Sequence, residues 1–230
     1  MAIKIIKAKD IQKKGTMNAL FYGPPGIGKT TLASTAPKPL FLDLERGTMS
    51  IMDKDIDLVE CTTIDDVKEA IQHAINNDYK SIIIDSLTRY SEILMEEICK
   101  DNKREKPQIQ DWGTLFEKIK KMVRYLQGQN LNIIFICLEK EDKDGDQKYV
   151  RPMLSGSLIQ PICGIVDLVG YINIGNDKKR RVSINPTSLW YAKHRSVSSN
   201  PINEDLEPDF PTIFNRIFSL SAPVKKEASE

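Results

Sequence analysis

The chain has 230 residues, of which 40% are hydrophobic, and its formal net charge is +1. This composition allows one sizeable core, and the small net charge excludes a general attraction to nucleic acid, so any basic contact surface must be local. No apolar run approaches the roughly 20 residues that a membrane span requires, and residues 1–9 lack the long apolar block of a secretory signal. We therefore expect a cytoplasmic protein that does not contact a membrane.

The cysteine and histidine residues argue against disulfides and zinc. Cys61, Cys99, Cys137 and Cys163 form no Cys-x-x-Cys pair, and each has apolar neighbours. We therefore expect buried, reduced thiols. The two histidines lie far apart in sequence, and such spacing does not indicate a zinc site.

Strands and helices are predicted to alternate in the first part of the chain. A short strand over residues 18–22 runs into a glycine-rich segment. A helix over residues 29–35 follows, and Pro37 must end it. A second strand is predicted over residues 39–45 (PLFLDLE), and a short third strand over residues 58–62.

A second helix is predicted to begin at Thr63. Thr63 and Asp66 have the spacing of a capping box, and the apolar residues that follow keep helical spacing. Residues 81–85 (SIIID) and 132–138 (NIIFICL) are continuous apolar runs, which suit strands buried on both faces of a parallel sheet. Between these two strands, helical patterns extend over residues 87–99 and 112–126.

The pattern changes after residue 138. Residues 143–146 (KDGD) carry the Asp-Gly signal of a tight hairpin. Three strand-like segments follow, which we expect to run antiparallel: residues 168–174, 181–184 and 189–192. Alternating strands and helices followed by hairpin-like strands predict an α/β fold with a mostly parallel central sheet and antiparallel C-terminal strands.

Residues 23–30 carry the pattern G-x-x-x-x-G-K-T between a predicted strand and a predicted helix, which is the context of a phosphate-binding loop. Gly26 and Gly28 allow backbone angles that turn successive amides toward phosphate oxygens. Lys29 should reach the β- and γ-phosphates, and Thr30 should bind a magnesium ion. The sequence thus predicts a site for ATP and Mg²⁺. The residues expected to contact the nucleotide are Gly23, Pro24, Pro25, Gly26, Ile27, Gly28, Lys29, Thr30 and Thr31.

Two acids at strand ends are candidates for binding magnesium and for catalysing hydrolysis. Asp85 ends the SIIID run, where P-loop proteins place an acid that holds magnesium directly or through water. Hydrolysis also needs a base beside the γ-phosphate. In AAA+ ATPases that glutamate usually follows the magnesium acid, a position that Ser86 fills here. Another strand must supply the base: period-2 spacing puts Asp43 and Glu45 on one face, and Glu45, nearer the carboxyl edge, is the predicted catalytic residue.

The segments FLDLE, IIIDS and IIFIC follow the phosphate loop in the order seen in RecA-like ATPases, and the chain resembles that family. In the family, the catalytic glutamate sits where Glu45 sits, and the magnesium acid and its following serine match Asp85 and Ser86. The family also carries a polar sensor at the end of the next core strand. That position falls near Leu138, which cannot serve, so Glu139 or Lys140 is left as the substitute.

Lys193, His194 and Arg195 follow the apolar residues 189–192. RecA-like and DnaB-like ATPases use a Lys-x-Arg element on a late strand, which reaches across a subunit interface to the neighbour's γ-phosphate and stabilises the transition state. Two cations spaced two apart on a strand share a face and can point at one phosphate. The resemblance therefore implies catalytic roles for Lys193 and Arg195 and an active homo-oligomer, either a ring or a filament.

A narrower resemblance rests on FYGPPGIGKTTLA, Glu45, YAKHRSVSSN and DLEPDFPTIFNRI, which together look like the phage nucleotide-binding proteins of the RecA-like single-strand-annealing group. It covers roughly residues 18–217. We expect a single ATPase domain over residues 1–220, with an N-terminal segment at 1–16 and a flexible tail at 221–230. The resemblance implies annealing or strand exchange on single-stranded DNA in the host cytoplasm, with a single-strand-binding protein as a further partner.

Residues 100–106 (KDNKREK) are net positive and lie where RecA-like recombinases place a DNA-facing loop, although a solvated loop is the alternative. The hairpin over residues 139–151 contains five acids and four cations, which makes it a poorer candidate. Other functions share these motifs. A ring-forming helicase or loader motor has all of them, a small-molecule kinase has the phosphate loop, and a nucleotide-gated scaffold would bind ATP with little turnover.

Overall fold

The computed structural model describes residues 15–144, 147–175, 177–196 and 202–218. The predicted N-terminal segment at 1–16 lies almost entirely outside the described residues, and the predicted tail at 221–230 lies entirely outside them. That residues 1–220 form a single domain stays a prediction.

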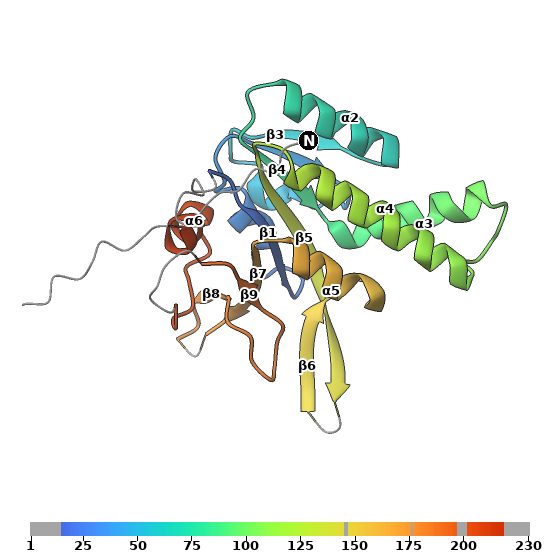
Figure 1. Cartoon of the computed structure of the whole chain (residues 1–230). Coiled ribbons are helices and arrows are strands. Elements are labelled where there is room, and N and C mark those ends of the chain that lie inside the picture. Colours follow the sequence, from blue (N-terminus) through green and yellow to red (C-terminus); the bar gives the residue numbers. More distant parts are fainter. Residues whose placement is uncertain (1–14, 145–146, 176, 197–201, 219–230) are drawn as a thin grey trace, which may run out of the picture.

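The described residues form one nine-stranded sheet, in which seven strands have the order β3-β2-β4-β5-β1-β7-β8 (Figure 1). The remaining two strands, β6 and β9, pair with β5 and β7. The strands are β1 (Asn18–Gly23), β2 (Pro39–Asp43), β3 (Asp57–Glu60), β4 (Ser81–Asp85), β5 (Asn132–Asp144), β6 (Gln147–Pro152), β7 (Leu168–Ile174), β8 (Arg180–Ser183) and β9 (Lys193–His194). The helices are α1 (Lys29–Ala33), α2 (Ile64–Asn76), α3 (Leu87–Asp101), α4 (Ile109–Gln127), α5 (Gly156–Ile165) and α6 (Phe210–Phe218).

The core of the sheet is parallel. Strand β1 pairs in parallel with both β5 and β7, and β4 does the same with β2 and β5. The antiparallel pairs are β5 with β6, and β7 with β8 and β9. This arrangement confirms the predicted α/β fold class, with a mostly parallel central sheet and antiparallel additions.

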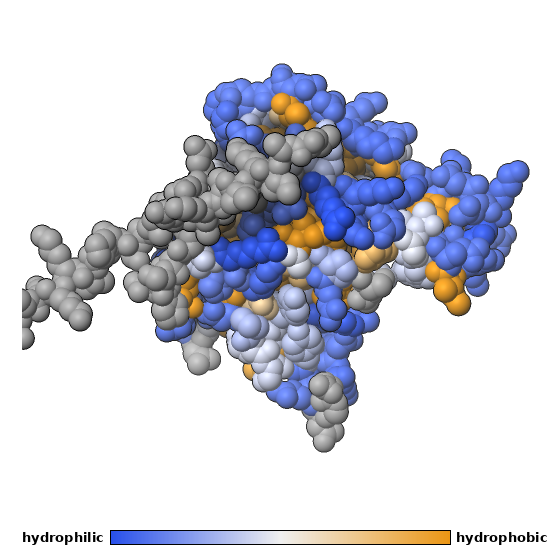
Figure 2. All heavy atoms as spheres, in the orientation of Figure 1, coloured by the Kyte–Doolittle hydropathy of each residue, from blue (hydrophilic) through white to orange (hydrophobic). Residues whose placement is uncertain are grey.

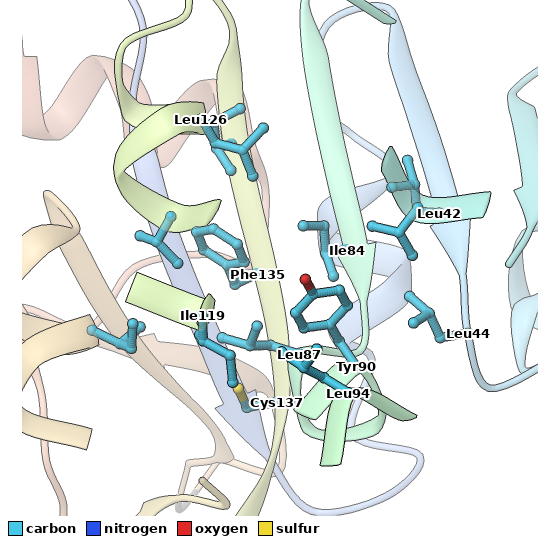
Figure 3. Close-up of a cluster of buried hydrophobic side chains, with 14 of the residues drawn as sticks. Leu42, Leu44, Ile84, Leu87, Tyr90, Leu94, Ile119, Leu126, Phe135 and Cys137 are labelled. Carbon is cyan, nitrogen blue, oxygen red and sulfur yellow. The ribbon is translucent and has the colours of Figure 1, made fainter. Parts of the chain in front are cut away.

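Helices cover both faces of the sheet, and the strand residues alternate between the two cores. Leu20 and Tyr22 of β1 pack in the core that α2, α3, α4 and α5 cover, whereas Ala19 and Phe21 pack in the core under α1 and α6. Figure 3 shows the first core, where Phe135 of β5 lies among side chains of α3, α4 and the neighbouring strand β4. Each fully buried large side chain contributes about 1.5–3 kcal/mol. Continuous apolar strands are therefore favoured here, because both faces exclude water.

Several local predictions are confirmed. Thr63 and Asp66 form the expected capping box at the start of α2, because each side chain accepts a hydrogen bond from the other residue's backbone amide. The four cysteines are buried and free.

Figure 2 shows a largely hydrophilic face with separate hydrophobic patches. No helix among the described residues is long and apolar enough to cross a membrane.

The C-terminal half differs from the prediction in two ways. Strand β7 runs parallel to β1, because the helix α5, which the sequence did not predict, carries the chain back across the sheet. Pro161 inside α5 disturbs the helical pattern, which explains why it was missed. Residues 189–192 were predicted to be a strand. Instead, Trp190 makes an isolated parallel bridge to Val150, and the short strand β9 begins at Lys193.

Candidate nucleotide-binding site

A pocket of about 440 Å³ opens at the carboxyl edge of the sheet, where β1, β2, β4 and the core part of β5 end together. In parallel sheets, ligands bind at this edge. The lining comes from the phosphate loop, the segments after β2 and β4, the end of the core part of β5 and the start of β8. The lining residues are Pro25, Gly26, Gly28, Lys29, Thr30, Thr31, Glu45, Gly47, Ser50, Asp85, Ser86, Ile136, Leu138 and Arg180.

The phosphate loop has the backbone that the motif predicts. Gly26 and Gly28 have φ angles of 73° and 103°, a left-handed conformation that residues with a side chain rarely adopt. A Cβ atom at Gly23 would lie 2.6 Å from the Ile172 carbonyl oxygen, so only glycine fits against β7. The side chain of Ile27 points into the core and anchors the loop rather than lining the pocket.

Lys29 is buried and lies over the loop. Its Nζ donates hydrogen bonds to the carbonyl oxygens of Gly23 (3.0 Å) and Pro24 (2.8 Å). Burial lowers the pKa of Lys29, and the nearby carboxylates of Asp85, Glu45 and Glu139 oppose that shift. The lysine is thus held at the mouth of the loop, where phosphate oxygens can replace the carbonyl acceptors.

Thr30 and Asp85 are brought together by the fold. The Thr30 hydroxyl donates a 2.7 Å hydrogen bond to Asp85 Oδ2. Burial raises the pKa of Asp85 to about 6, and the Thr30 hydroxyl opposes this shift. A hydroxyl and a carboxylate are the hard oxygen donors that Mg²⁺ prefers alongside phosphate oxygens and water. The donor set therefore fits the predicted ion, and the described residues hold no cluster of three or more His, Cys, Asp or Glu side chains suited to another metal.

Glu45 reaches the pocket and Asp43 does not. The Ser86 hydroxyl donates a hydrogen bond to the Glu45 carboxylate and accepts one from the backbone amide of Arg89 (3.1 Å), so Ser86 connects Glu45 to the start of α3. Asp43 is buried, and its carboxylate accepts hydrogen bonds from the Arg46 amide (2.7 Å) and other groups of the following loop. The expectation that the two acids share a face was wrong, because β2 ends at Asp43 and the chain turns there.

Leu138, at the predicted sensor position, lies beside Gly23 of β1 and places an apolar side chain in the lining of the pocket. Of its two candidate substitutes, Glu139 acts electrostatically on the pKa of Lys29. Lys140 instead lines a groove beside Trp112 and Met153, away from the pocket.

Lys193 and Arg195 lie at the opposite edge of the sheet. His194, between them, pairs with Leu168 at the amino end of β7. The ammonium group of Lys193 donates hydrogen bonds of 2.7–2.9 Å to carbonyl oxygens at the end of α5: those of Cys163, Gly164 and Val166. Arg195 donates to the Gly164 carbonyl oxygen at 2.6 Å and pairs with Asp167 at 3.8 Å. Neither cation lines the nucleotide pocket of its own chain.

The basic stretch 100–106 is only partly available for ligands. Arg104 makes two 2.7 Å hydrogen bonds to the buried carboxylate of Asp111 and so connects the end of α3 to α4. The backbone amide of Gln108 and the Arg104 guanidinium lower the pKa of Asp111. Three other cations of the stretch are exposed: Lys100, Lys103 and Lys106.

Four lining residues were not anticipated from the sequence, namely Gly47, Ser50, Ile136 and Arg180, and Arg180 is the cation among them. Arg180, at the start of β8, lies beside Gly28 of the phosphate loop. The alternation of Arg180, Val182 and Ile184 could have placed it on the α1 face, since the other two belong to the core on that side. Arg180 lies next to the phosphate loop because of the strand order, which cannot be read from the sequence.

Comparisons with known proteins show which family the chain matches and which solved structures it is similar to. The model of the AAA domain family matches residues 16–196, more than half of the chain. No curated protein is similar enough in sequence to match. A KaiC-like protein of the hyperthermophilic archaeon Pyrococcus horikoshii OT3 is 19% identical, with a TM-score of 0.46 over 72% of this chain and 76% of that one. An ATPase of the type III secretion system of pathogenic bacteria is 14% identical, with a TM-score of 0.45 over 68% of this chain.

The chain spans about half of the secretion ATPase, 51% of its length. The family match, by contrast, includes the phosphate loop, both strand-end acids and the Lys-His-Arg element. With that match and a complete phosphate loop at the carboxyl edge of its sheet, the chain belongs to the AAA domain family and is a P-loop ATPase.

Proposed function

We propose that this ATPase works as a homo-oligomer and couples its nucleotide state to single-stranded DNA in phage-type recombination, by annealing or strand exchange. The observation that best supports ATP hydrolysis is that three separate chain segments bring four side chains to one pocket: Lys29, Thr30, Glu45 and Asp85. A nucleotide-binding scaffold does not need a carboxylate oriented by a neighbouring hydroxyl, whereas a hydrolase does.

Each side chain has a role that its position supports. Lys29 exchanges its carbonyl acceptors for the β- and γ-phosphates. Thr30 and Asp85 would hold Mg²⁺, which neutralises charge on the phosphate oxygens when bound. Glu45 takes the proton of the attacking water, and the Ser86 hydroxyl keeps its carboxylate oriented.

The oligomer follows from the position of the Lys-His-Arg element. Lys193 and Arg195 lie at the amino edge of the sheet, so they cannot serve the pocket of their own chain without a large rearrangement. A neighbouring subunit can bring its pocket to them. In that assembly both cations leave the carbonyl groups at the end of α5 and contact the neighbour's γ-phosphate.

The DNA part of the proposal rests on the resemblance to the phage single-strand-annealing group and on local charge. The net charge of +1 requires that weak local contacts add up, and an oligomer repeats each cation along one track. The exposed lysines of the stretch 100–106 are the candidates for these contacts. A single-strand-binding protein in the host cytoplasm would be a further partner.

Steady-state ATP hydrolysis with and without single-stranded DNA, together with size-exclusion chromatography, tests the proposal. We expect MgATP-dependent assembly and turnover that single-stranded DNA stimulates. Strand unwinding under the same conditions would favour a helicase or loader motor instead. Tight ATP binding with negligible turnover under every condition would favour a nucleotide-gated scaffold and reject the hydrolase.

A further inference from the structure

Arg180 is a cation that the chemistry described above does not use. It is the first residue of β8, its side chain is exposed, and it lines the nucleotide pocket. A Cβ atom built at Gly28 would lie 3.4 Å from its Nη1 atom and 3.5 Å from its Cδ atom. The guanidinium therefore lies directly against the phosphate loop, at a position where the loop carries no side chain to keep it away.

The fold holds Arg180 in this position. Val182, two residues further along β8, is buried in the core on the α1 side, so Arg180 projects toward α1 and the loop before it. The β7–β8 turn is closed by a 2.8 Å hydrogen bond from the Gly175 amide to the Lys179 carbonyl oxygen. The neighbouring Arg181 projects the other way and donates to Asp177 at 2.6 Å. In the part of the chain that the structure describes, no carboxylate pairs with Arg180.

The strand order decides which end of a nucleotide Arg180 meets. Asp85 ends β4, and Glu45 follows β2. Both strands lie on one side of β1, whereas β8 lies on the other side. A triphosphate whose γ-phosphate faces Glu45 and Asp85 must therefore extend across the loop toward β8. The opposite end of the phosphate chain then comes to the guanidinium of Arg180, which binds phosphate oxygens with two parallel hydrogen bonds.

We propose that Arg180 binds the α-phosphate end of the nucleotide from within the same chain, an inference that rests on the proposed ATPase site. It is a ground-state binding residue rather than a transition-state group. ATP and ADP carry the same α-phosphate, so both use it. Together with Lys29, it gives a single chain two cations for nucleotide capture that do not depend on a neighbouring subunit, unlike Lys193 and Arg195.

The test compares Arg180→Ala and Arg180→Lys with the matched control Arg181→Ala, which removes the adjacent arginine on the other face of β8. Dissociation constants for MgATP, ADP and inorganic tripolyphosphate are measured by calorimetry, and kcat and KM by steady-state hydrolysis. For Arg180→Ala we expect about tenfold weaker binding of all three ligands, a similar rise in KM and a kcat within about twofold of wild type. Arg180→Lys should recover part of the affinity, and Arg181→Ala should bind as wild type does.

Several outcomes would overturn the proposal. Unchanged affinities in Arg180→Ala would show that Arg180 does not contact the nucleotide. Weaker ATP and ADP binding with unchanged tripolyphosphate binding would indicate that Arg180 contacts the base or ribose. A hundredfold loss of kcat with unchanged affinity would indicate that Arg180 acts on the γ-phosphate in the transition state. If the wild-type protein itself bound no nucleotide, the ATPase site would fail together with this inference, whereas the other outcomes leave that site standing. Melting curves of the unliganded variants check that each one folds.

Discussion

The hydroxyl of Thr30 donates a 2.7 Å hydrogen bond to the carboxylate of Asp85, 55 positions further along the chain. Thr30 lies in the first turn of α1, and Asp85 is the last residue of β4. The parallel sheet brings both to the same edge, so the two oxygen donors that we propose for Mg²⁺ lie together in the fold itself. Such preorganisation reduces the ordering that nucleotide binding has to impose.

Replacing Lys29 by alanine should weaken nucleotide binding or hydrolysis at least tenfold, about 1.4 kcal/mol, because it removes the charge held over the loop. Calorimetry with MgATP and a phosphate-release assay measure the two effects. Lys80→Ala is a suitable control, since Lys80 is exposed and pairs with Asp78 far from the pocket. Wild-type turnover in purified Lys29→Ala would contradict the assignment of the site.

Glu45→Gln should separate binding from chemistry. The amide keeps the shape and can still hydrogen-bond Ser86, but it cannot take a proton, so MgATP should bind while hydrolysis falls roughly 100-fold. Ser86→Ala should lower kcat less, because it removes only the hydroxyl that orients the carboxylate. Single-turnover assays with saturating protein measure both. If Asp43→Asn abolished the chemical step and Glu45→Gln did not, the roles of the two acids would be reversed.

Lys193→Ala and Arg195→Ala should suppress hydrolysis while leaving nucleotide binding largely intact, because we propose that both cations act on a neighbour's nucleotide. Mixing Arg195→Ala protein with Glu45→Gln protein should partly restore activity, since some interfaces then carry both intact groups. Both single variants should also lose hydrogen bonds to the end of α5, so their melting temperatures must be recorded. Absence of recovery at every mixing ratio, in oligomers shown to exchange subunits, would argue against a shared site.

Lys103 and Arg104 should behave differently in DNA binding. Lys103 is exposed, so Lys103→Ala should flatten the salt dependence of single-stranded DNA binding without lowering the melting temperature. Arg104→Ala should lower the melting temperature, because it leaves the buried Asp111 without its ion pair. Fluorescence anisotropy with a long labelled oligonucleotide and an ATP analogue, over a salt series, measures the first effect. No binding at low salt with micromolar protein would reject the recombination function.

Local patterns predicted much of this protein. The phosphate loop was predicted because its glycines, lysine and threonine are contiguous and lie between a strand and a helix. The buried strands β4 and β5 and the capping box of α2 were predicted because apolar runs and short side-chain contacts depend only on near neighbours. Asp85 could be placed at the site for the same reason, since it directly ends such a run.

The tertiary structure alone decided which distant groups meet. The direction of β7, the position of Arg180 beside Gly28, the pairing of Arg104 with Asp111 and the carbonyl partners of Lys193 all depend on strand order, on the crossover through α5 or on side-chain packing. A sequence pattern reports which face of an element is apolar, but not which other element covers that face. These contacts arise only when the whole sheet is assembled, because the free energy that selects them comes from burying both faces of the sheet at once.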